Sequence, residues 1–491
     1  MIKISDSKIL LRTTKTFAAA AAVSAFICAG TGSACANWSN SDIAGAVTSS
    51  DSTKITDDFH RAVNKNWIAN AKIKPGESST SAFKERDDEV EEQIKAQLTD
   101  KNEKSHEAML AQKFYGLVLD WDARNKAGIS PVMPLIEQIE AISNMEELTA
   151  YLTDRTKPHF GGRLLGVGTT KDSKDSSNMT TEVYRTGLSL GDAGEYNAPA
   201  LSPTAERRKK ANDVFHVKLL VKAGFDKDRA EKMNEAHFRV ERAIAKNSMS
   251  VKEIHAPEAR QKMYNVRTKE DLAAASPAFP LIAVIDALGY GHSREFVLEE
   301  PSWLTAMNEY YKHENLSDIK DYLIVSTLRG TVNLLDREAR DFAVEQSNAV
   351  MGSEGSIPDD KLAYEMTDGW LSEAVGRMWA EKYATSKTKS DIEKMIGEVI
   401  AYYRDMLTRE TWLSPETREK AINKLDHVTV RAAYPNKWED FSELDFKGAD
   451  EGGSLVDAAW SISRFELSRD VKLVNTKTDR EKWNISPSIV N

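Results

Sequence analysis

The sequence has very little cysteine, and the little it has lies at one end. Cys28 and Cys35 are the two cysteines among 491 residues, and both fall within the first 36 positions. Without these first 36 residues the chain has no thiol, which excludes disulfide bonds, zinc–thiolate sites and a cysteine nucleophile. We therefore expect the rest of the chain to be held together by its hydrophobic core alone.

An excess of positive charge is also lacking. Lysine and arginine number 66 against 76 aspartates and glutamates, for a net charge of −10, so nothing in the charge balance points to nucleic acid as a partner. The chain is 41% hydrophobic and 29% charged, which excludes collagen-like, disulfide-scaffold and wholly disordered proteins. Its length predicts two or three domains.

The first residues resemble an export signal. A basic stretch with Lys3, Lys8 and Arg12 precedes an Ala-rich apolar run over 17–30, and small residues flank Cys35 at the end of that run. This order predicts a signal peptide at 1–36, cleaved after Ala36, and a bacterial protein exported to the periplasm or beyond. An N-terminal membrane anchor is the alternative, and a lipoprotein is disfavoured because neither cysteine follows a convincing lipobox. After cleavage we expect no stable membrane span.

A polar linker at 37–55 precedes a region in which helical periodicity dominates. Apolar residues recur at helical spacing over 83–98 and 392–407, and Ser414-Pro415 is a typical helix start before an apolar face. That face consists of Ala421, Ile422, Leu425 and Val428. Between 160 and 190, short apolar runs separated by a polar loop predict a small β-hairpin. The predicted fold class is mainly α.

Three local patterns imitate functional motifs. The stretch 187–191 reads G-x-S-x-G, but a nucleophile elbow must turn from a strand directly into a helix, and here a loop sequence with Pro199 follows. Gly166-Val167-Gly168 lacks the third glycine of a dinucleotide-binding turn. The charged run 206–210 is typical of a solvated helix face. None of the three predicts a catalytic or cofactor site.

Histidine spacing provides no metal site either. The nine histidines are His60, His106, His159, His216, His237, His255, His292, His313 and His427. No two are closer than 18 residues, whereas a zincin helix needs a pair at i and i+4 with a glutamate between them. The stretches that begin at His106 and His313 start as H-E but end in leucine and serine. Spacing alone therefore predicts no catalytic residue and no metal ligand.

A series of longer stretches nevertheless resembles one family. The segment 57–67 reads DDFHRAVNKNW and is similar to D-D-F-Y-x-Y-V-N-G-x-W, the opening of the neprilysin and endothelin-converting-enzyme family of zinc metalloendopeptidases. Further matches follow in family order at 73–75, 78–79, 82–83, 114–115, 124–129, 187–190, 192, 196, 412–417, 424–425 and 434–438. Departures occur at His60, Ala62 and Lys65. At these three positions the local packing is expected to differ from that of the family, but the resemblance as a whole is unaffected.

The resemblance implies a particular architecture. Members have a large helical N-terminal domain that caps a thermolysin-like catalytic domain, and the two enclose a chamber for oligopeptides. An H-E-x-x-H motif and a further glutamate hold the catalytic zinc, and a histidine stabilises the oxyanion. On this basis 56–438 is expected to be the helical cap domain, and 439–491 only the beginning of the catalytic domain.

These 491 residues contain no H-E-x-x-H motif. They end in WNISPSIVN, which is similar to the family's W-x-M-x-P-x-x-V-N, so Asn491 corresponds by resemblance to a residue that binds the substrate backbone. No catalytic residue and no metal ligand has a counterpart here, so zinc belongs to full-length members. Apolar residues beyond 440, such as Leu455, Val456, Trp460, Ile462 and Phe465, are expected to lack their packing partner.

Two functions remain open. In the first, the chain is the N-terminal part of an exported neprilysin-like zinc metalloendopeptidase. It is then truncated and inactive by itself, and a separately encoded catalytic fragment is its partner. In the second, it is a stand-alone exported module that binds peptides without cutting them. The end of the sequence inside a recognisable motif favours the first.

Overall fold

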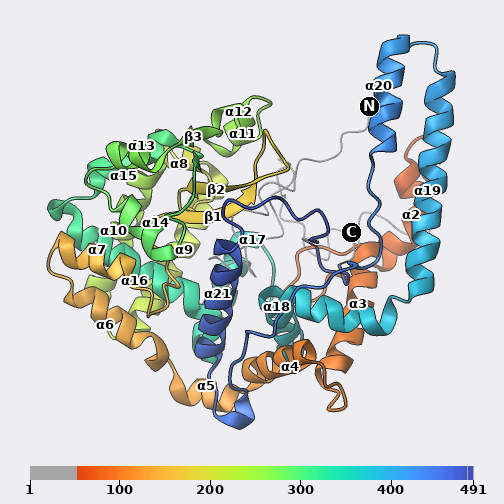
Figure 1. Ribbon diagram of the computed structural model, residues 1–491. Coiled ribbons are helices and arrows are strands. Elements are labelled where there is room, and N and C mark those ends of the chain that lie inside the picture. Colours follow the sequence, from red (N-terminus) through yellow and green to blue (C-terminus); the bar gives the residue numbers. More distant parts are fainter. Residues whose placement is uncertain (1–51, 484, 490–491) are drawn as a thin grey trace. The chain divides into compact units, whose positions relative to one another are not determined.

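The computed structural model describes residues 52–483 and 485–489, and it is mainly helical with one small sheet (Figure 1). The predicted fold class is thereby confirmed. The predicted signal peptide lies outside the described residues, as do most of the linker and Asn491. In the part that is described, no helix combines the length and the apolar character needed to cross a bilayer.

The chain divides into two compact units, each built from separate stretches. The first unit contains the described residues up to 80 together with 117–359 and 446–478. The second contains 81–116, 360–445 and the described residues from 479 onward.

The first unit is a helical assembly around long, amphipathic helices. Its α-helices are α2 (Phe59–Asn70), α5 (Trp121–Ala127), α6 (Met133–Ala141), α7 (Met145–Thr153), α8 (Ala193–Asn197), α9 (Pro203–Lys222), α10 (Lys227–Ala245), α11 (Val251–Ile254), α12 (Ala259–Lys262), α13 (Lys269–Ala275), α14 (Leu281–Leu288), α15 (Pro301–Tyr310), α16 (Leu316–Thr331), α17 (Arg337–Met351) and α21 (Leu455–Val471). Short 3-10 turns are η2 (Ser130–Val132), η3 (His313–Asn315), η4 (Val332–Leu334) and η5 (Ala449–Glu451). Helix α10 packs against α9 and α16, and α9 packs against α17.

The predicted hairpin exists and is part of a larger sheet. Strands β1 (Gly166–Lys171) and β2 (Met179–Tyr184) pair antiparallel, with Val167 opposite Val183. The sheet continues through β4 (Phe296–Leu298), which runs parallel to β2, to β3 (Asn265–Arg267) at the far edge. Strands β3 and β4 have three residues each, which is too short to give a periodic signal, so the sequence did not predict them.

Helix α21 corrects the expectation for the last fifty residues. Leu455, Val456, Ile462 and Phe465 are all buried, so the prediction that they lack a packing partner is wrong. The Asp470 carboxylate near the end of α21 accepts hydrogen bonds from the β1 backbone and from Thr169 and Tyr290. This segment therefore completes the core of the first unit.

The second unit contains five helices. They are α3 (Ala82–Leu98), α4 (His106–Leu119, whose last turn belongs to the first unit), α18 (Asp359–Tyr383, whose first residue also does), α19 (Ser386–Arg409) and α20 (Pro415–Asp426). Lys361 of α18 and Glu91 of α3 form a buried ion pair at 2.9 Å.

Helices α19 and α20 pack against each other as a hairpin, and neither has a fully buried residue. The Ser414 hydroxyl accepts a hydrogen bond from the Thr417 backbone and Pro415 occupies the first turn, as the sequence predicts. The predicted face of α20 is only half-buried, and Val428 lies beyond the helix with half its surface exposed. The sequence thus located the helix correctly but overestimated its burial.

Candidate functional site

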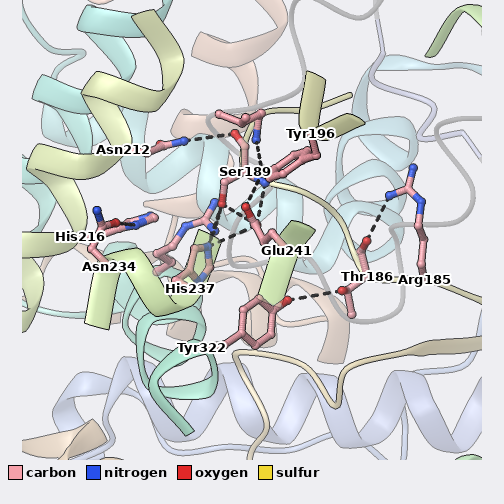
Figure 2. A network of polar contacts seen from close by, with 12 residues as sticks. Arg185, Thr186, Ser189, Tyr196, Asn212, His216, Asn234, His237, Glu241 and Tyr322 are labelled. Carbon is pink, nitrogen blue, oxygen red and sulfur yellow. Dashed lines mark hydrogen bonds and ion pairs between the residues drawn. The ribbon is translucent and has the colours of Figure 1, made fainter. Parts of the chain in front are cut away.

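A network of buried and half-buried polar side chains surrounds the G-x-S-x-G segment (Figure 2). Ser189 lies in the turn between β2 and the short helix α8, where no strand enters a helix directly. Its side chain points inward and is buried among α9, α10 and α16, which contribute Asn212, His237 and Arg329. The structure agrees with the prediction that this segment is a loop.

Serine, histidine and glutamate meet here, but in the wrong order for a catalytic triad. The Ser189 hydroxyl donates to the Glu241 carboxylate at 2.7 Å and lies 3.0 Å from His237 Nε2. Glu241 is 3.3 Å from that same nitrogen, whereas the acid of a triad must hold the other ring nitrogen. Because glutamate contacts the hydroxyl directly and all three side chains are buried, Ser189 cannot serve as a nucleophile for an outside substrate.

Glu241 is the centre of this network. It accepts hydrogen bonds from the Ser189 backbone amide at 2.8 Å and from the Tyr196 hydroxyl. Burial alone would raise its pKa, but His237, the Arg329 guanidinium and the Tyr196 hydroxyl together lower it to about 2. Burial, and after it the Glu241 carboxylate, raise the pKa of Tyr196. Glu241 is therefore a buried carboxylate that stays ionised and holds the 187–196 segment by its backbone.

Further contacts fix the segment from the side of α9. Asn212 donates its side-chain amide to the Ser189 carbonyl at 3.1 Å, and the Arg208 guanidinium donates to the Leu190 carbonyl at 2.7 Å. Gly191 has a φ of 84°, and a Cβ there would meet the Arg208 guanidinium at 2.1 Å. Glycine is thus required both for the backbone conformation and for the close approach.

Two buried histidines lie side by side behind Ser189. The rings of His216 on α9 and His237 on α10 are 4.9 Å apart, edge to face, and both are fully buried. Sequence reasoning did not bring them together, because they are 21 residues apart on different helices. The i, i+4 spacing of His237 and Glu241 on one helix was the available signal.

These residues do not fit a metal. Among the described residues, no three histidine, cysteine, aspartate or glutamate side chains are placed to hold an ion. Glu241 is already occupied by four donors from the protein, and Asn491 lies outside the described residues.

The stretches that resemble the neprilysin family have structural roles in the described part. Arg124 donates to the carbonyls of Val118, Asn333 and Leu335, and its guanidinium lies 3.8 Å from the centre of the Trp121 ring. In the second unit, the rings of Tyr434 and Trp438 stack with centroids 6.2 Å apart. These contacts brace turns and helix ends.

Comparison with known proteins agrees with the resemblance of these stretches to the neprilysin family. The model of the N-terminal domain of peptidase family M13 matches residues 55–435. The chain belongs to this family.

Relatives within peptidase family M13 are distant in sequence. The neutral endopeptidase of Lactococcus lactis subsp. cremoris is 24% identical over 445 residues, which cover 89% of this chain and 69% of that protein. Endothelin-converting enzyme 1 of Rattus norvegicus is 22% identical over 460 residues, covering 88% and 58%.

Solved M13 structures share the fold. PEPO from Lactobacillus rhamnosis superposes with a TM-score of 0.80 at 20% identity, over 88% of this chain and 68% of that one. Mycobacterium tuberculosis zinc metalloprotease ZMP1 with an inhibitor gives 0.78 at 21% identity, over 91% and 67%. The family thus consists of zinc metallopeptidases, while the described residues of this chain provide no zinc donor set.

Proposed function

We propose that this chain provides the N-terminal part of an exported, neprilysin-like zinc metalloendopeptidase that hydrolyses oligopeptides. Its 491 residues are inactive alone, and the zinc centre is contributed by a catalytic polypeptide that carries H-E-x-x-H. Residues 56–438 correspond to the family's helical cap domain and 439–491 to the start of its catalytic domain, although 446–478 fold into the first unit of this chain.

One observation supports the proposal above the others. The M13 model matches residues 55–435, yet the sequence has no H-E-x-x-H motif and the described residues offer no three-ligand metal site. Zinc hydrolases need three protein ligands and an open position for water, so a chain without them cannot activate water in this way.

Catalysis is tested by comparing the purified chain with material captured from the cells that produce it. We expect the purified chain, dialysed and then given one equivalent of zinc, to retain no stoichiometric metal and to leave fluorogenic oligopeptides uncut. Tagged chain captured from its own cells should bring with it a polypeptide containing H-E-x-x-H and a peptide-cleaving activity that 1,10-phenanthroline abolishes. The tag expressed without the chain is the control for capture.

Other outcomes lead elsewhere. Chelator-sensitive hydrolysis by the purified chain with one bound zinc contradicts the proposal. Saturable binding of oligopeptides, measured by fluorescence anisotropy, with no hydrolysis even in captured material supports the alternative of a stand-alone peptide-binding module.

Asn491 is proposed to bind the substrate backbone, by resemblance alone. Its side-chain amide offers both donors and an acceptor, as an extended peptide backbone requires. In the captured, active material, Asn491→Ala should raise KM or lower kcat/KM without changing zinc content. Unchanged kinetics contradict the role.

Export is proposed from the leader sequence. N-terminal sequencing of protein recovered outside the cytoplasm should begin at Asn37. Recovery of a chain that still begins at Met1 in the membrane fraction supports an anchor in its place.

A further inference from the structure

We propose that His216 is an acid-sensitive latch between α9 and α10. The neutral imidazole fits the closed packing of the two helices, and at acidic pH its protonation favours a state in which the helices and the 187–196 segment have loosened. The inference concerns the first unit alone and depends neither on zinc nor on a peptide substrate.

The hydrogen bonds around His216 fix its protonation state. Its Nδ1 lies 2.7 Å from Asn234 Oδ1, and the Asn234 amide nitrogen donates to Asp213 at 2.8 Å. The amide oxygen therefore faces the ring, so Nδ1 must carry the proton. His216 Nε2 has no hydrogen-bond partner among the described residues. A second proton on Nε2 would be buried without an acceptor, which is costly in the interior.

The surrounding charges oppose that second proton as well. The groups that act on the His216 ring are Lys209 on α9, His237 and Asn234 on α10, and the Arg329 guanidinium on α16. The nearest carboxylates act only through intermediaries, Asp213 through Asn234 and Glu241 through His237. Burial first, and then His237 and Arg329, lower the pKa of His216 well below its ordinary value.

His237 differs because it contacts a carboxylate. Its pKa is lowered by burial and by Arg329, but Glu241 opposes the shift. Tyr322 stacks on its ring with centroids 5.0 Å apart. His216 has no such compensation and is therefore the more sensitive member of the pair.

Opening of the α9–α10 contact lets His216 bind a proton. A histidine exposed by opening has a pKa near about 6.5, while the closed state binds no proton on Nε2 until far lower pH. The pKa of His216 is lower in the closed state than in the open state. The closed state is therefore favoured at pH values above the open-state pKa, and its population falls as the pH drops below that value. The opening equilibrium should grow about tenfold for each pH unit below about 6.

The opened state should release a defined segment. Asn212, Ser189 and Glu241 connect α9 and α10 to the 187–196 turn, and Phe215 and Phe238 pack around the His216 ring. Separation of the two helices breaks this set together. Residues 187–196 and the facing turns of α9 and α10 should therefore become accessible to solvent at the same pH.

Hydrogen–deuterium exchange of the full chain at pH 7, 6 and 5, corrected for intrinsic exchange rates, tests this. In the wild type, peptides covering 187–196, 211–219 and 230–245 should exchange about tenfold faster for each pH unit below about 6. In His216→Gln, which keeps a donor for Asn234 but cannot be protonated, this dependence should flatten. His255→Gln, at an exposed histidine bonded to its own helix, should behave as the wild type.

Two further points keep the test decisive. His159 is also buried, with a pKa lowered to about 3 by burial and by Arg163, but its contacts lie at 151–163, so its effect appears in other peptides. If His216→Gln does not fold, NMR titration of the wild-type imidazoles replaces it. A His216 signal that titrates near pH 6.5 in the folded protein overturns the proposal, as does a pH dependence in His216→Gln that is as steep as in the wild type; a weaker dependence there comes from His237.

Discussion

Charged side chains are used in opposite ways in the buried network around Glu241, in the first unit, and on helix α19, in the second. In the first, Glu241 lies inside the protein and accepts hydrogen bonds from the Ser189 amide, the Ser189 hydroxyl and Tyr196, while half-buried Arg329 donates to Ser189. In the second, the charges of α19 pair along their own helix, as Lys387 with Asp391 and Lys394 with Glu398, on exposed surfaces. Buried charges that are fully bonded specify one arrangement of the backbone, whereas exposed pairs mainly keep a helix surface hydrated.

The largest expected effect comes from removing the centre of the buried network. Glu241→Ala leaves the Ser189 amide, the Ser189 hydroxyl and the Tyr196 hydroxyl without their acceptor, and each buried donor left unsatisfied costs about 1–3 kcal/mol of unfolding free energy. Urea unfolding followed by circular dichroism should show it. Glu398→Ala on α19 is the matched control, and its unfolding midpoint should not move. Equal midpoints for the two variants contradict the contrast.

A smaller loss tests the burial of α21. Ile462 is 2% exposed, so Ile462→Ala leaves a cavity and should lower the free energy of unfolding by about 3 kcal/mol. Val399→Ala removes methyl groups of a side chain that is 48% exposed and should have little effect. If Ile462→Ala is as mild as Val399→Ala, the last segment is not part of the first unit's core.

A pH-dependent effect follows from an acid pair on the sheet. Burial, reinforced by Glu182 and Glu300, raises the pKa of Glu299 from 4.5 to about 8. The folded state keeps this proton while the unfolded chain loses it, so stability falls as pH rises from about 4.5 to about 8. Glu299→Gln should therefore gain on the order of 1–2 kcal/mol over the wild type between pH 5 and pH 9. Exposed Glu295→Gln should gain nothing; a similar gain there would refute the assignment.

The smallest expected effect is at the start of α20. Ser414→Ala removes the acceptor for the Thr417 amide and should cost about 1 kcal/mol, confined to the second unit. Faster hydrogen exchange in the first turn of α20 is the measurement. Glu419→Ala, inside the same helix, should leave that turn unchanged. An effect that spreads into α10 would contradict the separation of the units.

Local features were predictable from the sequence, and long-range ones were not. The start of α20, its serine cap and the β1–β2 hairpin follow from side-chain chemistry and periodicity within a few residues. Burial depends on what the rest of the fold brings against a helix: the spacing over 392–407 correctly predicts a helix, but Met395 on its apolar stripe is 62% exposed.

The buried site illustrates the same limit. Ser189 was found through its motif and its segment was predicted as a loop, which the structure shows, because the elbow rule concerns local chain geometry. Its partners Glu241 and Arg329 lie 52 and 140 residues away, and no spacing rule joins them. Only the family resemblance carried long-range information, and the M13 match confirmed it.

The discontinuity of the units also governs the order in which they are made. During synthesis, residues 117–359 leave the ribosome well before α21, which belongs to the same core, and 81–116 must wait for 360–445. Each unit therefore remains incomplete until its last stretch has been made, and apolar surface is open to chaperones or to aggregation in the interval.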